Sequence, residues 1–215
     1  MSMRVALKSL PREKADTVAC QLAMALMLLD DDPAAAHAYA QAAVHRAGRV
    51  GVVREIAGLA AYRAGDWATA LRDLRAHRRI TGDQTNLAII ADAERGRGRP
   101  QEAIQLAEEA DLAELPTATR VELAIVVSGA WRDQGDLDRA RKALEIPELD
   151  PDTAYAFSAR LFEAYADVLK TLGDPAARDW AVRAGVAEQA WARREGGDLD
   201  DDAEFSIRDL GEIIE

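Results

Sequence analysis

Residues 58–74 read Gly-Leu-Ala-Ala-Tyr-Arg-Ala-Gly-Asp-Trp-Ala-Thr-Ala-Leu-Arg-Asp-Leu, and their pattern decides the fold. The Gly65-Asp66 step at the centre predicts the end of one helix and the immediate start of another. Glycine readily adopts the left-handed conformation that closes a helix, and an aspartate side chain caps the first amides of the next. Gly58 and Ala70 are small, which lets two helix axes approach closely. The stretch therefore predicts a helical hairpin.

Turns of the same kind recur along the chain at a nearly constant spacing. They lie at residues 31, 65, 98, 135 and 173, so the intervals are 34, 33, 37 and 38 residues. Alanine stands five residues after four of these turns, at Ala36, Ala70, Ala103 and Ala140, whereas the fifth copy has Arg178. All seven prolines fall at the helix ends that this spacing predicts, where they interrupt no helix.

The repeat predicts ten helices arranged as five hairpins. The first helices are expected near 12–30, 50–64, 84–97, 117–134 and 152–172, and the second helices near 33–48, 66–80, 100–112, 136–146 and 175–195. No stretch alternates polar and apolar residues for long enough to indicate a sheet. The 45 alanines also favour closely packed helices over strands. The expected fold class is therefore all-α.

The stretch from Gly58 to Leu74 resembles the tetratricopeptide repeat (TPR), a 34-residue helix-turn-helix unit with small, aromatic and alanine positions in this order. The stretches 91–107 and 128–144 resemble it more loosely, and the chain is similar to an uncharacterised group of bacterial TPR-like proteins. The resemblance implies a right-handed α-solenoid of about five hairpins over 1–194, and the charge distribution indicates an acidic tail over 195–215. The last two intervals exceed 34 residues, which leaves open a longer related hairpin there. Stacked hairpins would bury six large side chains: Trp67, Leu74, Trp131, Leu144, Trp180 and Trp191.

Charge and hydropathy disfavour several classes of partner. The formal net charge is -11, and nine acidic residues with one arginine in 195–215 contribute -8 of it. Such acidity argues against nucleic-acid binding, because the phosphates would be repelled. The longest apolar run, 22–29, is too short for a bilayer, which needs about 20 residues. With a single cysteine and no signal-peptide pattern, we expect a cytoplasmic protein that does not bind membranes.

The resemblance also implies where a partner would bind, because the first helix of each hairpin lines the concave face of a TPR superhelix. The positions three residues before each turn belong to that face. The first of these positions is Leu28, at a hydrophobic end. The other four, with the neighbour Arg63, carry a tyrosine and four cations: Tyr62, Arg63, Arg95, Arg132 and Lys170. Such a wall would favour an extended acidic peptide, with the tyrosine as a stacking surface. The alternative is that these are solvated side chains near helix C-termini, where cations suit the helix dipole.

No motif in the sequence points to catalysis, a cofactor or a metal. A phosphate loop, a dinucleotide-binding glycine motif and a nucleophile elbow are all missing. His37, His45 and His77 fall on second helices without a carboxylate at zinc spacing, so surface or packed histidines are expected. Cys20 lies in the apolar stretch from Val18 to Leu29 and is expected in the core. We therefore expect no enzymatic activity.

The sequence favours a non-catalytic interaction module that holds a peptide or helix in a concave groove. One interpretation of the tail is that it docks in this groove, in its own chain or a neighbour, and gates access to it. The tail carries five large apolar residues: Phe205, Ile207, Leu210, Ile213 and Ile214. The spacing of 207, 210 and 214 is that of one face of a helix. A disordered, solubilising tail is the other interpretation. A structural protein that self-associates into a homo-oligomer is the alternative function.

Overall fold

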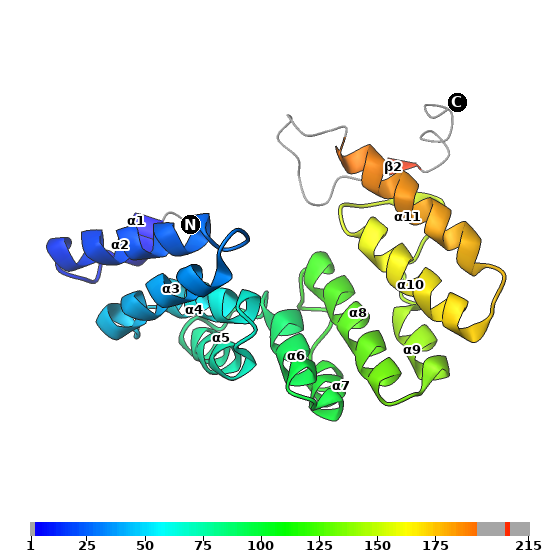
Figure 1. Cartoon of the computed structure of the whole chain (residues 1–215), viewed down its shortest axis with the longest axis horizontal. Coiled ribbons are helices and arrows are strands. Elements are labelled where there is room, and N and C mark those ends of the chain that lie inside the picture. The colour runs from blue at the N-terminus through cyan, green and yellow to red at the C-terminus, as the bar shows by residue number, and fades with distance from the viewer. Residues whose placement is uncertain (1–2, 193–204, 207–215) are drawn as a thin grey trace. The chain divides into compact units, whose positions relative to one another are not determined.

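The computed structural model describes residues 3–192 and 205–206, with side chains over 5–192, and divides into two compact units (Figure 1). Unit 1 spans Met1–Arg99 and unit 2 spans Pro100–Glu215, so the boundary follows the turn at Gly98. Both units are built from helices, which confirms the all-α prediction. Within the described ranges, no helix is both long and apolar enough to cross a membrane.

Unit 1 consists of helices that pack on one another in chain order. Its elements are α1 (Met3–Ala6), α2 (Arg12–Met27), α3 (Pro33–Ala47), α4 (Gly51–Arg63), α5 (Trp67–Thr81) and α6 (Leu87–Gly96). Helix α2 packs on α3, α3 on α4, α4 on α5 and α5 on α6, while α1 contacts α2 and α4. The sequence did not predict α1. A core cluster of aliphatic side chains from α2, α3 and α4, rich in alanine, holds the first part of the unit together.

Unit 2 repeats this arrangement and adds one short pair of strands. Its elements are α7 (Pro100–Glu108), α8 (Thr117–Asp133), α9 (Leu137–Leu144), β1 (Thr153–Ala154), α10 (Ser158–Leu172), α11 (Ala177–Ala192) and β2 (Phe205–Ser206). Successive helices from α7 to α11 pack on each other. Strands β1 and β2 are antiparallel, with Thr153 opposite Ser206 and Ala154 opposite Phe205. Helix α10 therefore begins later than residue 152, the predicted start, because 153–154 are extended.

The strand pair involves a small part of the predicted tail. It brings residues 205–206 against the connection between α9 and α10. The remainder of the tail, including the helical spacing predicted from residue 207 onward, lies outside the described residues.

The predicted turns are built as the sequence indicates. Four of them contain a glycine with φ between 72° and 78°: Gly65, Gly98, Gly135 and Gly173. The side chains of Asp32, Asp66 and Asp136 each accept a hydrogen bond of 3.0 Å from the backbone N–H three residues later. Pro33 and Pro100 are the first residues of their helices, where proline costs no hydrogen bond. Local chemistry at the turns thus sets the helix boundaries.

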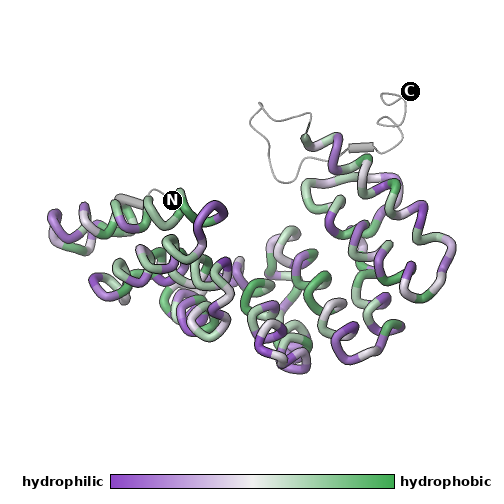
Figure 2. Tube along the Cα trace, viewed as in Figure 1, coloured by the Kyte–Doolittle hydropathy of each residue, from purple (hydrophilic) through white to green (hydrophobic). Residues whose placement is uncertain are grey.

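Small residues at fixed distances from the turns form the contacts between helices. The four alanines that follow a turn by five residues are fully buried: Ala36, Ala70, Ala103 and Ala140. Gly58 of α4 lies so close to α5 that a Cβ there would be 2.5 Å from Leu74 Cγ and 3.0 Å from the Leu74 backbone nitrogen. Apolar residues recur between hydrophilic ones along the helices (Figure 2). Close approach of the helices therefore depends on the small side chains at these positions.

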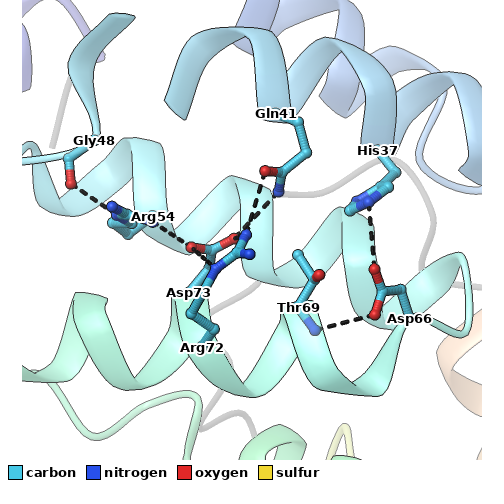
Figure 3. Close-up of polar contacts among 8 residues, drawn as sticks. All are labelled: His37, Gln41, Gly48, Arg54, Asp66, Thr69, Arg72 and Asp73. Carbon is cyan, nitrogen blue, oxygen red and sulfur yellow. Dashed lines mark hydrogen bonds and ion pairs between the residues drawn. The ribbon is translucent and has the colours of Figure 1, made fainter. Parts of the chain in front are cut away.

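A buried acid connects three helices of unit 1 (Figure 3). Asp73 of α5 is fully buried, and Gln41 of α3 donates to it at 3.2 Å. Arg72 donates to the same carboxylate at 2.8 Å. Arg54 of α4 also pairs with Asp73 and donates from Nε to the Gly48 carbonyl at 2.7 Å. Burial alone would raise the pKa of Asp73, but these hydrogen bonds outweigh it and lower the pKa.

The four tryptophans are half-buried, which corrects the prediction that they sit inside the core. Leu74 and Leu144, predicted with them, are fully buried as expected. Trp67 is the first residue of α5, so its ring lies near a turn. Trp131 is near the end of α8, and the Arg139 guanidinium carbon lies 4.6 Å from the centre of its ring. The large rings are thus partly covered, while alanines make up much of the buried core.

Cys20 is exposed, so the prediction that it belongs to the core is wrong. Helix α2 buries Val18, Leu22 and Ala25 along one face. An α-helix turns about 100° per residue, which places Cys20 about 200° around the axis from Val18. Because nearly the whole stretch is apolar, its sequence pattern does not indicate which face of the helix turns inward.

Candidate functional site

Tyr62 and Arg95, both predicted to contact a partner, lie together in unit 1. Tyr62, near the end of α4, donates from its hydroxyl to Asp92 Oδ2 at 2.5 Å. Arg95, in the last turn of α6, donates from Nη1 to Asp92 Oδ1 at 2.5 Å. Asp92 thus joins two successive first helices. Sequence reasoning missed Asp92, although its position three residues before Arg95 places both on one side of a helix and was a readable signal.

The ring of Tyr62 is held by its neighbours. Its centre lies 5.2 Å from that of Trp67, and the two planes meet edge to face at 66°. Trp67 in turn packs under Gly96, where a Cβ would lie 2.9 Å from the indole ring. Burial raises the pKa of Tyr62 to about 12, helped by the hydrogen bond to Asp92. At neutral pH, Tyr62 is therefore a fixed hydrogen-bond donor.

Arg63 extends this group of residues toward solvent. Its Nε lies 3.3 Å from Asp30 Oδ1, and the two side chains are 52% and 80% exposed. Exposed pairs of this kind contribute about 0–1 kcal/mol, so another carboxylate could replace Asp30 at little cost. We call Tyr62, Arg63, Asp92 and Arg95 the Tyr62 cluster. Each of its two cations has an acidic partner, so its charge is more balanced than the sequence pattern suggests.

The two other predicted contact residues belong to unit 2. Arg132 lies in the last turn of α8 and Lys170 in the last turn of α10. Both side chains are exposed, and within the described ranges neither is in an ion pair. Helices α8 and α10 contact each other. Two of the predicted contact residues therefore lie exposed in unit 2, while the Tyr62 cluster lies in unit 1.

The histidines occupy three different environments. His45 is exposed, and His37 is half-buried with its Nε2 3.7 Å from Asp66 Oδ2. His77 is packed, as the sequence led us to expect of a histidine on a second helix, and is 4% exposed. Among the described residues, Glu55, His77 and Asp83 form a group that could hold a metal ion.

Sequence reasoning missed this group because its members are far apart in the chain. Glu55 precedes the turn at Gly65 by 10 residues, and His77 follows the turn by 12. In a hairpin, positions at similar distances from the turn lie opposite each other. Pairing residues across each predicted turn would therefore have brought Glu55 and His77 together.

A hollow of about 570 Å³ lies in unit 1 beside the first part of α2. Its lining is partly apolar, from Leu7, Leu10, Ala15 and Ala19. The other lining residues are Lys8, Arg12, Asp16 and Cys20. The lining places no histidine beside the Cys20 thiol. The arrangement is therefore not that of a thiol activated by an imidazole.

Comparison with family models and with curated proteins assigns no family to this chain. No family model matches it, and no curated protein matches it significantly. The TPR resemblance rests on the residues of the repeat itself, and function has to be inferred from the sites described above.

Proposed function

We propose that this chain is a non-catalytic protein-interaction module. Its TPR-like hairpins form a right-handed α-solenoid, and its first helices bind a peptide or helix of acidic character. The Tyr62 cluster is the observation that carries the proposal. In it, residues from two successive first helices, expected on one binding surface, meet around a single carboxylate.

The Tyr62 cluster is well suited to a partner that carries a carboxylate. Tyr62 and Arg95 are already held by Asp92, so little side-chain entropy is lost when a partner contacts them. Arg63 is the adaptable member, because its pair with Asp30 is exposed and weak. A partner would place a carboxylate at Arg63, in exchange for Asp30, and an apolar group against the fixed ring of Tyr62.

The nearly balanced charge of the cluster limits long-range attraction. Asp30 and Asp92 offset the charges of Arg63 and Arg95. We therefore propose moderate affinity that falls with ionic strength, since the exchangeable pair is exposed to solvent.

The buried acids of unit 1 support a structural role over a catalytic one. Asp73 is held by Arg54, Arg72 and Gln41, as described above. Glu94, 2% exposed, accepts a hydrogen bond of 2.6 Å from Arg75. A carboxylate fixed in this way stabilises helix packing and is poorly placed to exchange protons with a substrate.

The proposal is tested by reversing the charge of Arg63. Wild type, Arg63→Glu and Arg46→Glu are used as baits in cell lysate, and proteins are identified that wild type retains and Arg63→Glu loses. Arg46 is the matched control, because it is exposed and lies in the last turn of a second helix, α3. The proposal requires a partner that Arg46→Glu also retains. Identical capture by all three baits would contradict it.

Self-association is a second candidate function, favoured by exposed apolar side chains. Met27 of α2 is 72% exposed and Val182 of α11 is 60% exposed. Light scattering over a range of protein concentrations tests this function. A mass that rises with concentration and falls in Met27→Lys or Val182→Lys supports it, whereas a constant monomer mass excludes it.

The tail belongs to the proposal as a gate for the binding surface. The pairing of β2 with β1 supports contact between the tail and the body of unit 2. Deletion of 197–215 is expected to increase partner affinity and to change its dependence on salt. Unchanged affinity on deletion would remove the tail from the proposed function.

A further inference from the structure

Three potential metal ligands converge in unit 1 where α4 meets the end of α5. One ligand atom from each of Glu55, His77 and Asp83 lies within 4.8 Å of the other two. Glu55 belongs to α4, His77 to α5, and Asp83 to the connection between α5 and α6. His77 is buried and the two carboxylates are half-buried, so the group is largely shielded but reachable from solvent.

The hydrogen bonds of His77 decide which ring nitrogen carries a lone pair. Nδ1 lies 3.1 Å from the carbonyl oxygen of Gly51, which can only accept, so Nδ1 carries the proton. The neutral ring therefore presents a lone pair at Nε2. Thr81 Oγ1 is 3.4 Å from Nε2, but its hydroxyl donates to the His77 carbonyl at 2.9 Å. That hydroxyl proton does not satisfy Nε2.

The lone pair of His77 faces a carboxylate. Nε2 lies 3.7 Å from Asp83 Oδ2, and a carboxylate oxygen of Glu55 is close to both ligand atoms. Three acceptor atoms thus lie within 4.8 Å of one another, an arrangement that a metal cation between them stabilises.

Several contacts hold the three ligands in place. The Thr85 backbone N–H donates to Asp83 Oδ1 at 2.8 Å, which leaves Oδ2 on the side of His77. Asn86 Nδ2 donates to Glu55 Oε1 at 3.1 Å. Metal-binding histidines commonly donate their other ring N–H to a backbone carbonyl, as His77 does to Gly51. Side chains oriented in this way lose little freedom when an ion binds.

From this arrangement we propose that Glu55, His77 and Asp83 form a binding site for a divalent transition metal ion, best matched by Zn²⁺. One imidazole nitrogen and two carboxylates suit this class of ion, whereas Ca²⁺ and Mg²⁺ prefer oxygen ligands only. Three protein ligands leave a coordination position for water. The ion joins α4, α5 and the α5–α6 connection, so its role is to stabilise unit 1.

Titration of the untagged full-length chain with Zn²⁺ alone tests the site, after removal of metals by a chelator. Wild type is expected to bind one equivalent. Even partners that only orient a metal ligand change affinity by about 10–100-fold, so losing a ligand is expected to weaken binding at least about tenfold. Asp83→Asn and Glu55→Gln are the test variants. Asp83→Asn retains an oxygen that can accept the bond from Thr85, so the turn is preserved.

His37→Gln is the matched control, because His37 also lies 3.7 Å from a carboxylate but, among the described residues, belongs to no group that could hold a metal ion. This control should bind Zn²⁺ like wild type. Zn²⁺ should also raise the unfolding temperature of wild type and His37→Gln, but not of Asp83→Asn or Glu55→Gln. If one test variant fails to fold, as judged by circular dichroism, the other decides.

Two results would overturn the proposal. The first is the absence of saturable Zn²⁺ binding to the folded wild type. The second is Zn²⁺ binding that persists with unchanged affinity in both Asp83→Asn and Glu55→Gln. Each result is independent of partner binding at the Tyr62 cluster.

Discussion

At the scale of single residues, the absence of a side chain at Gly58 sets the distance between α4 and α5. A Cβ at this position would lie 2.5 Å from Leu74 Cγ. Gly58→Ala is therefore expected to destabilise the protein by about 1–3 kcal/mol, because the overpacked helices must shift apart. Denaturant unfolding measures the change.

Gly185 of α11 is the matched control for that substitution. A Cβ at Gly185 meets nothing within 4 Å. Gly185→Ala is expected to stabilise the chain by about 0.5–1 kcal/mol, since alanine costs less entropy in a helix than glycine. Equal effects of the two substitutions would contradict the close contact at Gly58.

Tyr62 carries the second residue-scale prediction. Its pKa is about 12 because it is buried and bound to Asp92. A raised pKa means that the folded state holds its proton more tightly than the unfolded state. The resulting stabilisation is present below pH 10 and is lost as the pH rises through 12. Absorbance at the tyrosinate band should show a group that titrates near pH 12, and Asp92→Asn should lower the pKa of that group.

Single residues differed in how far the sequence revealed their roles. The glycines and aspartates of the turns act within a few residues of themselves, so their conformations were predictable. The acids beside the predicted cations were harder to foresee, since Asp30 reaches Arg63 from the connection between α2 and α3. Glu55, His77 and Asp83 come together only when α4 and α5 pack. Pairings that depend on tertiary contact were therefore missed.

At the scale of elements, side-chain caps decide where helices begin. Asp136 Oδ1 accepts a hydrogen bond of 3.0 Å from the Arg139 N–H at the start of α9. Asp136→Ala is expected to cost about 0.5–2 kcal/mol of stability, whereas Asp136→Asn should retain nearly all of it. Thermal unfolding of the two variants separates a capping effect from a charge effect. If the charge of Asp136 were what stabilises α9, Asp136→Asn would lose as much stability as Asp136→Ala.

The buried acid Asp73 predicts how helix packing depends on pH. Its pKa is lowered, so its stabilisation is fully present above the ordinary value of 3.8 and is lost as the pH falls through the lower folded value. Asp73→Ala leaves Arg54 without its buried partner and should cost about 3–5 kcal/mol at neutral pH. The difference from wild type should shrink below about pH 4, in unfolding curves measured across that range. A difference that does not change with pH would contradict this account.

The helix boundaries show which elements a repeat can predict. Turns marked by Gly, Asp and Pro placed most helix ends within a few residues. Helix α10 began later than expected because 153–154 pair with 205–206, a contact between segments distant in the sequence that no local pattern indicates. The start of α6 was also late, since Asp83 and Thr85 form a turn there through their own hydrogen bond.

At the scale of the whole molecule, each unit carries part of the proposed binding surface. The Tyr62 cluster lies in unit 1, and Arg132 and Lys170 lie in unit 2. Charge reversal in one unit alone therefore shows whether that unit contributes to binding. A partner sensitive to Arg63→Glu and to Arg132→Glu must use both units.

The central claim is that partner binding depends on the Tyr62 cluster, and the affinity of a captured partner tests it most directly. Titration calorimetry with that partner, at low and at high salt, compares wild type with Arg63→Glu and Arg46→Glu. We predict that Arg63→Glu binds at least about tenfold more weakly, a loss of about 1.4 kcal/mol, and that Arg46→Glu binds like wild type. High salt should reduce the difference in affinity between wild type and Arg63→Glu. Equal affinities for Arg63→Glu and Arg46→Glu at both salt concentrations would contradict the claim.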